Sequence, residues 1–171
     1  MRRVTQSDIS AEELKQLIPN PNMRRRMSPM VRMAVATAVK VLGNEQPTHI
    51  LCVSKMAQLT ETMQFMQQVI DSGATAVSPT PFITSTFNTV GGYIALVTGC
   101  HCENITLADS GEDEAERYLH AVFAEQPEAK VLVCRYEEPG RWNDDFRAAI
   151  DFEGEQDETG VMAVSELREK V

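Results

Sequence analysis

Two thiols and one imidazole lie within three consecutive positions, at Cys100, His101 and Cys102. Thiolate and imidazole are ligands that zinc prefers, and a structural zinc site needs four such ligands. The remaining cysteines, Cys52 and Cys134, lie in apolar segments, where a free cysteine behaves as a small buried hydrophobic residue. The sequence therefore lacks a second ligand cluster, and we expect neither a bound metal nor a cofactor.

Nucleophilic catalysis has two candidate sources in this sequence. A thiol at position 100 or 102 could use His101 as a base, but neighbouring residues of an extended segment point to opposite sides. Ser110 lies between an apolar segment and an acidic helix start, where a nucleophile could stand. However, the pattern G-x-S-x-G is absent, and the carboxylates of residues 112–116 cancel the positive potential that an oxyanion requires. Acyl transfer by Ser110 or by a cysteine remains an alternative function.

Charge is distributed unevenly along the 171 residues. The chain has 16 basic and 25 acidic residues and a formal net charge of −9. Basic residues predominate only in the first third, where Arg24, Arg25 and Arg26 are consecutive. The net acidity disfavours nucleic acid as a partner, since neutralising phosphates needs a broad basic surface. The arginine run is either a solvated surface or a docking site for an acidic partner, such as an acyl carrier protein.

Composition points to one soluble domain over residues 1–171. Apolar residues make up 43% of the chain, and no apolar run approaches the roughly 18 residues that a membrane span needs. The N-terminus is charged and has no apolar core typical of a secretory signal. We therefore expect a cytoplasmic protein with reduced thiols and no membrane span.

Apolar periodicity predicts the elements of the first half. We expect a short helix over 11–17, ended by the Pro/Asn run 19–22, and a long helix from Pro29 to Gly43 with Ser28 as its N-cap. A buried strand is predicted over 49–53. A second amphipathic helix follows, with its apolar stripe at Leu59, Met63, Met66 and Ile70, and we expect it to end at Gly73.

The second half continues the alternation of strands and helices. Residues 74–92 are rich in turn formers, and the apolar pattern of 93–97 fits a strand or a buried helix equally well. Strands are predicted over 104–108 and 130–134, with an amphipathic helix between them that begins after Asp109. The acidic stretch 137–158 follows, and the apolar pieces 146–152 and 161–164 could form a terminal hairpin. Together these elements predict an α/β layer.

Several segments in order resemble the N-terminal half of a β-ketoacyl synthase, a family with the thiolase fold. The segments are 26–34 (RMSPMVRMA), 78–92 (SPTPFITSTFNTVGG) and 104–109 (NITLAD). In this alignment Asn88, Gly92 and Gly99 match residues of the family, and residues 93–98 belong to its buried central helix. The resemblance covers about residues 23–138, which leaves 139–171 as an acidic C-terminal extension. It implies half of a thiolase-like fold, with a mixed sheet and helices packed on it.

The departures from the family determine the function that the resemblance implies. A gap-free alignment places the family's nucleophilic cysteine at Gly111, which has no side chain to acylate. The family's two histidines and its lysine belong to a second half that this sequence does not contain, while His49 and His120 fit structural roles. We therefore expect no catalytic residue.

The resemblance then implies a noncatalytic subunit, similar to the chain length factors of type II polyketide synthases. Such a subunit pairs with a full-length ketosynthase as a heterodimer and shapes the acyl tunnel. Short proteins of this kind occur in aryl-polyene pathways, so polyene, polyketide or fatty-acid biosynthesis is the implied context. A small α/β binding protein without an acyl connection is a further alternative. The implied interface and tunnel residues are Thr84, Phe87, Asn88, Gly92, Tyr93, Ile105 and Leu107, with carrier-protein docking at Arg24, Arg25 and Arg26.

Overall fold

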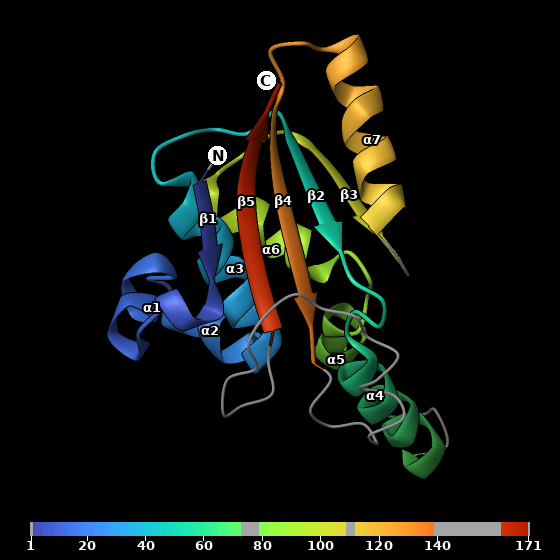
Figure 1. Ribbon diagram of the computed structural model, residues 1–171. Coiled ribbons are helices and arrows are strands. Elements are labelled where there is room, and N and C mark those ends of the chain that lie inside the picture. Colours follow the sequence, from blue (N-terminus) through green and yellow to red (C-terminus); the bar gives the residue numbers. More distant parts are fainter. Residues whose placement is uncertain (1, 73–78, 109–111, 139–161, 171) are drawn as a thin grey trace.

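A five-stranded mixed sheet forms the centre of the molecule (Figure 1). The computed structural model describes residues 2–72, 79–108, 112–138 and 162–170. The strand order is β1-β5-β4-β2-β3. The strands are β1 (Arg2–Thr5), β2 (His49–Val53), β3 (Glu103–Leu107), β4 (Lys130–Glu137) and β5 (Met162–Glu169). The observed α/β architecture agrees with the prediction.

Strands β2, β3 and β4 are parallel, whereas β1 and β5 are antiparallel to their neighbours. All five residues of β2 are buried because this strand is central and is covered on both faces. Leu51 is paired with Ile105 on one side and with Val133 on the other. The carboxyl ends of the three parallel strands therefore lie at the same edge of the sheet.

Helix α3 (Pro29–Leu42) is the main helix of the core and has the predicted boundaries. The Ser28 side chain accepts a hydrogen bond from the amide of Val31, and Pro29 occupies the first turn. Gly43 ends the helix at a φ of +58°, a conformation that favours glycine. A buried hydrogen bond of 2.9 Å between the hydroxyl groups of Thr37 and Ser165 joins α3 to β5.

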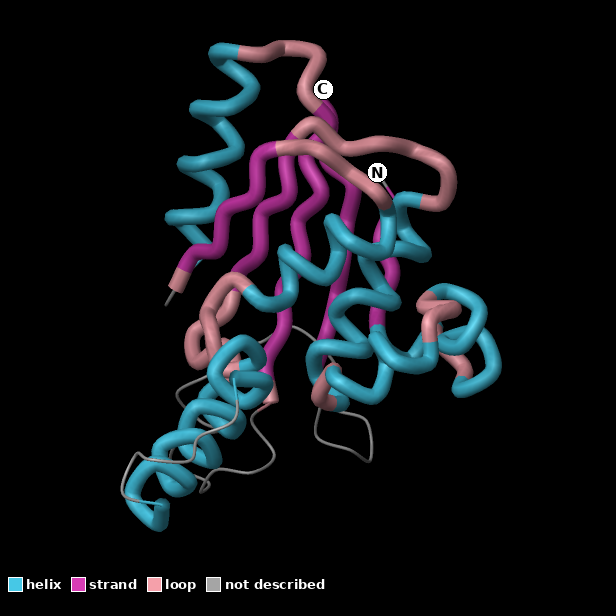
Figure 2. Tube along the Cα trace, turned by 180° about the vertical axis from the view of Figure 1, so that it is seen from behind, coloured by secondary structure: helices cyan, strands magenta, loops and turns pink. Residues whose placement is uncertain are grey.

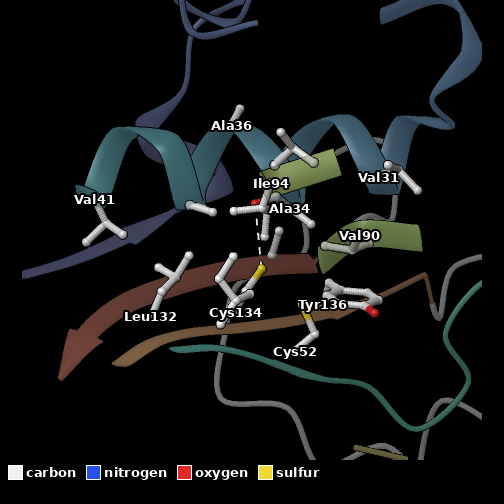
Figure 3. Packing of buried hydrophobic residues seen from close by; sticks show 14 of the residues in the cluster. Val31, Ala34, Ala36, Val41, Cys52, Val90, Ile94, Leu132, Cys134 and Tyr136 are labelled. Carbon is white, nitrogen blue, oxygen red and sulfur yellow. Dashed lines mark hydrogen bonds between the residues drawn. The ribbon is translucent and has the colours of Figure 1, made fainter. Parts of the chain in front are cut away.

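Helices cover the two faces of the sheet unequally. Helices α3 and α6 (Thr89–Thr98) lie on one face, and α7 (Glu112–Glu125) lies on the other (Figures 1 and 2). The larger core lies beneath α3, where Cys52, Cys134 and Tyr136 are fully buried (Figure 3). The smaller core lies beneath α7 and covers the strands β2, β3 and β4.

Four shorter or peripheral helices complete the described part of the chain, together with a 3₁₀ turn at Gln6–Asp8. They are α1 (Ala11–Leu17), α2 (Pro21–Arg26), α4 (Leu59–Ser72) and α5 (Pro79–Thr84). No helix in the described ranges is both long enough and apolar enough to traverse a bilayer.

Two sequence predictions differ from the structure. The 19–22 run ends α1 but also begins α2, because the Asn20 side chain caps that helix and Pro21 occupies its first turn. Residues 162–169 form a full strand that pairs with β4 and β1. The expected partner segment 146–152 lies outside the described residues.

The cysteine and helix predictions are also refined. Residues 93–97 belong to α6, so the helical alternative is correct. Cys100 and Cys102 are joined in a disulfide, so the prediction of four reduced thiols is wrong for these two. The turn after α6 brings the two sulfur atoms together, whereas Cys52 and Cys134 are free and buried.

Candidate interaction surface on α5 and α6

Helix α5, the turn after it and the outer side of α6 expose large apolar side chains. The exposed fractions are 57% for Phe82 and Ile83, 37% for Phe87 and 68% for Leu96. Monomeric proteins expose single apolar residues freely, but a cluster of large ones marks an interaction site. We call these four residues the α5–α6 surface.

The turn that presents Phe87 is held by side-chain hydroxyl groups. Thr86 and Thr89 both donate to the carbonyl of Ile83, at 3.0 and 2.9 Å, and their hydroxyl oxygens lie 2.9 Å apart. These hydrogen bonds replace backbone bonds that the irregular segment cannot make. The turn is therefore fixed, and it leaves Phe87 37% exposed.

Two adjacent glycines of α6 lie in opposite environments. A side chain at Gly91 would collide with the amide group of Asn104 on β3, so the close approach of α6 to β3 requires glycine here. Gly92 is exposed, and a side chain there would meet nothing within 4 Å. Gly92 and the neighbouring exposed Asn88 therefore leave a low, open area beside the α5–α6 surface.

The other residues implied at the interface are distributed over both faces of the sheet. The Thr84 hydroxyl donates to the carbonyl groups of Thr80 and Pro81, and Tyr93 is half-buried against the larger core. Ile105 and Leu107 pack into the smaller core beneath α7. Their side chains thus lie on the opposite face of the sheet from α6, whereas the Asn104 side chain of β3 lies against Gly91 of α6.

Strand β3 is an edge strand of the sheet. Its inner side pairs with β2, and no other described strand pairs with its outer side. An edge strand presents unpaired backbone N–H and C=O groups that can pair with a strand of another chain. The edge of β3 and the α5–α6 surface are therefore suited to form one continuous contact with a partner.

Helix α4 adds exposed apolar residues that the sequence did not assign to an interface. Met63 and Met66 are 51% exposed and Ile70 is 69% exposed. Phe65 of this helix contacts Phe82 of α5, with ring centroids 5.7 Å apart. The signal was present in the sequence as an apolar stripe, but a stripe does not reveal whether it faces the core or a partner.

The three arginines of the basic run differ in their surroundings. The Arg24 guanidinium donates to the carbonyl groups of Lys15 and Ile18 and so caps the end of α1. Arg25 and Arg26 are exposed in the last turn of α2, and Arg25 also donates to the side chain of Asn22. Only Arg25 and Arg26 present charge that a partner can reach without disturbing α1.

The candidate nucleophiles are inaccessible or lie outside the described residues. Cys52 and Cys134 are fully buried, and the pKa of Cys52 is raised by its hydrogen bond with Cys134 and by burial. A thiol with a raised pKa is a poor nucleophile at neutral pH. Ser110 and Gly111 lie outside the described residues. Within the described ranges there is no accessible free thiol and no group of ligands that could hold a metal ion.

Two of the three histidines lie away from this surface. His49 is buried at the start of β2, where its Nδ1 lies 2.8 Å from the Thr48 hydroxyl and its Nε2 lies 3.4 Å from Glu103. His120 is exposed on α7, on the other face of the sheet.

The fold and this surface define a ketosynthase-like protein, and comparison with known proteins agrees. The chain matches the family described as beta-ketoacyl synthase, N-terminal domain, over residues 3–145. It therefore belongs to the β-ketoacyl synthase family, as the sequence predicted. No curated protein matches the sequence significantly.

Solved structures show the same fold at low sequence identity. A ketosynthase (ApeO) in complex with its chain length factor (ApeC) from Xenorhabdus doucetiae matches with a TM-score of 0.73 and 19% identity, covering 100% of this chain and 78% of that chain. The ishigamide ketosynthase/chain length factor matches with a TM-score of 0.64 and 14% identity, over 90% and 47% of the two chains. A β-ketoacyl synthase from Burkholderia phymatum STM815 matches with a TM-score of 0.59 and 13% identity, over 89% and 44%. The chain thus has the thiolase-like half-fold that was predicted, and it spans less than half the length of the last two proteins.

Proposed function

We propose that this protein is a noncatalytic ketosynthase-like subunit, which pairs with an active β-ketoacyl-ACP synthase and shapes the length of the acyl product. The observation that carries this proposal is the α5–α6 surface beside the free edge of β3. Full burial of a large apolar side chain contributes about 1.5–3 kcal/mol before the entropy of association is subtracted. Each of these four contributes less, because 37–68% of it is exposed. A surface of this kind favours a lasting partner over a transient one.

The noncatalytic role is supported by the residues that could react. The family's nucleophile aligns with Gly111, and each described cysteine is either buried or paired in a disulfide. The half-fold can therefore contribute walls to a cavity without contributing a nucleophile. We place the protein in polyene, polyketide or fatty-acid assembly in the cytoplasm, with Arg25 and Arg26 as the contact for an acyl carrier protein.

Co-expression with a ketosynthase from the same organism tests the pairing. We expect the two chains to elute together as a 1:1 complex in size-exclusion chromatography with light scattering. Leu96→Glu should weaken the affinity at least tenfold, because it places a charge in an apolar contact. Ala124→Glu, at an exposed position on α7, is the matched control and should bind like the wild type. A wild-type chain that elutes as a monomer beside the ketosynthase would refute the pairing.

Product analysis of the same complex tests the shaping of chain length. Phe87→Ala removes an exposed ring from the surface and should allow longer acyl products, whereas Phe87→Trp should shorten them. Because Phe87 also belongs to the α5–α6 surface, assembly of each variant is measured by the same chromatography, and product lengths are compared at equal amounts of complex. An unchanged product distribution in both variants would contradict this part of the proposal.

A further inference from the structure

Helices α4 and α5 form an arm that extends away from the sheet (Figures 1 and 2). Neither helix contains a buried residue, and α4 packs chiefly on α5. Besides the contact of Phe65 with Phe82, the Thr62 hydroxyl donates to the carbonyl of Ser85 at 3.2 Å. Within the described residues the arm therefore has no core of its own that fixes its direction. The direction depends on the turn that joins α5 to α6 and on the connection between β2 and α4.

The connection between β2 and α4 is held by hydrogen bonds to the carboxylate of Glu137, the last residue of β4. The Ser54 hydroxyl donates to Oε1 of Glu137 at 3.0 Å, and the Lys55 amide donates to the same oxygen. The Ser54 oxygen in turn accepts the amide of Ala57 at 2.7 Å. Ala57 has a φ of +46°, which is unfavourable for alanine, so these hydrogen bonds hold the turn in a conformation it would otherwise leave.

Glu138, the residue that follows β4, holds the first turn of α4. The Thr60 hydroxyl donates to Oε2 of Glu138 at 3.0 Å, and the Glu138 side chain is also buried. Glu137 and Glu138 therefore bind two different points of the connection between β2 and α4. Together with the turn between α5 and α6, these contacts hold the arm in one direction.

The burial of the Glu137 carboxylate is not explained by a contribution to stability. It is only 3% exposed, and its Oε2 has no hydrogen-bond partner among the described residues. Burial raises its pKa, and hydrogen bonds from the Lys55 amide and the Ser54 hydroxyl offset part of that effect; the Lys55 charge acts in the same direction as these bonds. An apolar residue of similar size is often as stable at such a position, so we attribute to Glu137 a role in defining geometry.

We propose that Glu137 and Glu138 are positioning residues that set the direction of the α4–α5 arm, and thereby present Phe82 and Ile83 in the arrangement that a partner binds. The second clause rests on the proposed function, and the first does not. If the arm samples several directions, only a fraction of the molecules is competent to bind. The association rate then falls in proportion to that fraction, while the dissociation rate of the formed complex is unchanged.

Hydrogen–deuterium exchange of the isolated chain tests the first clause. Glu137→Leu keeps the volume but removes the acceptor, and should speed exchange over residues 55–62 at least tenfold while α3 and β2 exchange as in the wild type. Thr60→Val removes only the donor to Glu138 and should act over the first turn of α4 alone. Glu128→Leu, which replaces an exposed carboxylate in the turn after α7, is the matched control.

Binding kinetics with the ketosynthase test the second clause. Glu137→Leu should slow association about tenfold with an unchanged dissociation rate, whereas loss of a direct contact mainly speeds dissociation. Hydrogen exchange that is unchanged over residues 55–62, or that rises equally over the whole sheet, would refute the proposal that Glu137 and Glu138 set the direction of the arm. Should Glu137→Leu fail to fold, Thr60→Val and Glu138→Gln decide the same question. If local exchange rises but the wild type binds no ketosynthase, the positioning role of Glu137 and Glu138 is supported and the proposed function fails. If the wild type and the variant bind the ketosynthase at equal rates, the arm direction does not control partner binding.

Discussion

At the scale of single residues, Gly91 and Gly92 show how adjacent positions of one helix can have opposite requirements. Gly92→Ala should raise the free energy of unfolding by about 0.5–1 kcal/mol, because alanine favours the helix and meets no neighbour. Gly91→Leu should lower it by about 1–3 kcal/mol, because Gly91 is buried and the new side chain must displace the amide group of Asn104. Urea denaturation followed by circular dichroism measures both values.

The double variant Gly91→Leu/Asn104→Ala is the control for this pair. Removing the amide group of Asn104 opens space at the contact, so part of the stability lost in Gly91→Leu should return. Equal stability of Gly91→Leu and Gly92→Ala would show that α6 does not approach β3 as closely as the structure indicates.

Glu137 also predicts a pH dependence of stability. Burial holds its pKa above the usual value of 4.5 in the folded protein, so the folded state binds this proton more tightly than the unfolded chain. Its contribution to stability is therefore fully present below pH 4.5 and is lost as the pH rises through the raised pKa. The stability of the wild type minus that of Glu137→Gln should fall over this range, by an amount on the order of 1 kcal/mol. Denaturation curves of both proteins at a series of pH values test this, and a difference that grows with pH would contradict it.

At the scale of elements, the N-cap of α3 should influence global stability because this helix carries the larger core. Ser28→Ala removes the acceptor for the Val31 amide and should lower the free energy of unfolding by about 1 kcal/mol. Ser10 caps α1 in the same way, but α1 buries no residue. Ser10→Ala should therefore change global unfolding less, and chemical denaturation of the two variants side by side checks the difference. Equal losses would mean that α1 unfolds together with the core.

Helix α2 allows the docking function of the arginines to be separated from their structural function. Replacing both Arg25 and Arg26 with Glu should weaken binding of an acyl carrier protein several-fold, and the effect should shrink as salt is added. Arg24→Gln should instead loosen α1, because its guanidinium caps that helix. Titration calorimetry at low and high salt measures the binding of the carrier protein. Hydrogen exchange of residues 11–18 measures the loosening of α1. Carrier binding that is insensitive to the Arg25/Arg26 replacement would remove this contact from the proposal.

At the scale of the whole molecule, the exposed apolar residues should make the isolated chain self-associate. Phe82, Leu96 and Ile70 lie on three different helices and are all more than half exposed. Replacing Phe82 and Leu96 with Lys should reduce self-association at high concentration without lowering the unfolding temperature, because neither side chain belongs to the core. Dynamic light scattering and thermal melts measure these effects. Equal self-association of the wild type and the variant would show that other residues form the self-association surface.

Local patterns in the sequence predicted most of the elements. Ser28, Pro29 and Gly43 delimit α3, and the boundaries of α1 and β2 also agree with the prediction. These features depend on residues close in sequence, through capping, proline geometry and apolar periodicity. The short elements β1, α2 and α5 were not predicted, because their existence depends on partners far along the chain, such as β5 for β1.

The sequence by itself therefore determined the α/β layer and the family, whereas of the α5–α6 surface it named only Phe87. The tertiary structure alone decided which side chains are available. It exposed the apolar stripe of α4, placed Ile105 and Leu107 beneath α7, and buried Glu137 and Glu138 in the connection to the arm. The physical reason is that periodicity identifies which residues share a face of an element, whereas burial depends on what the rest of the chain packs against that face.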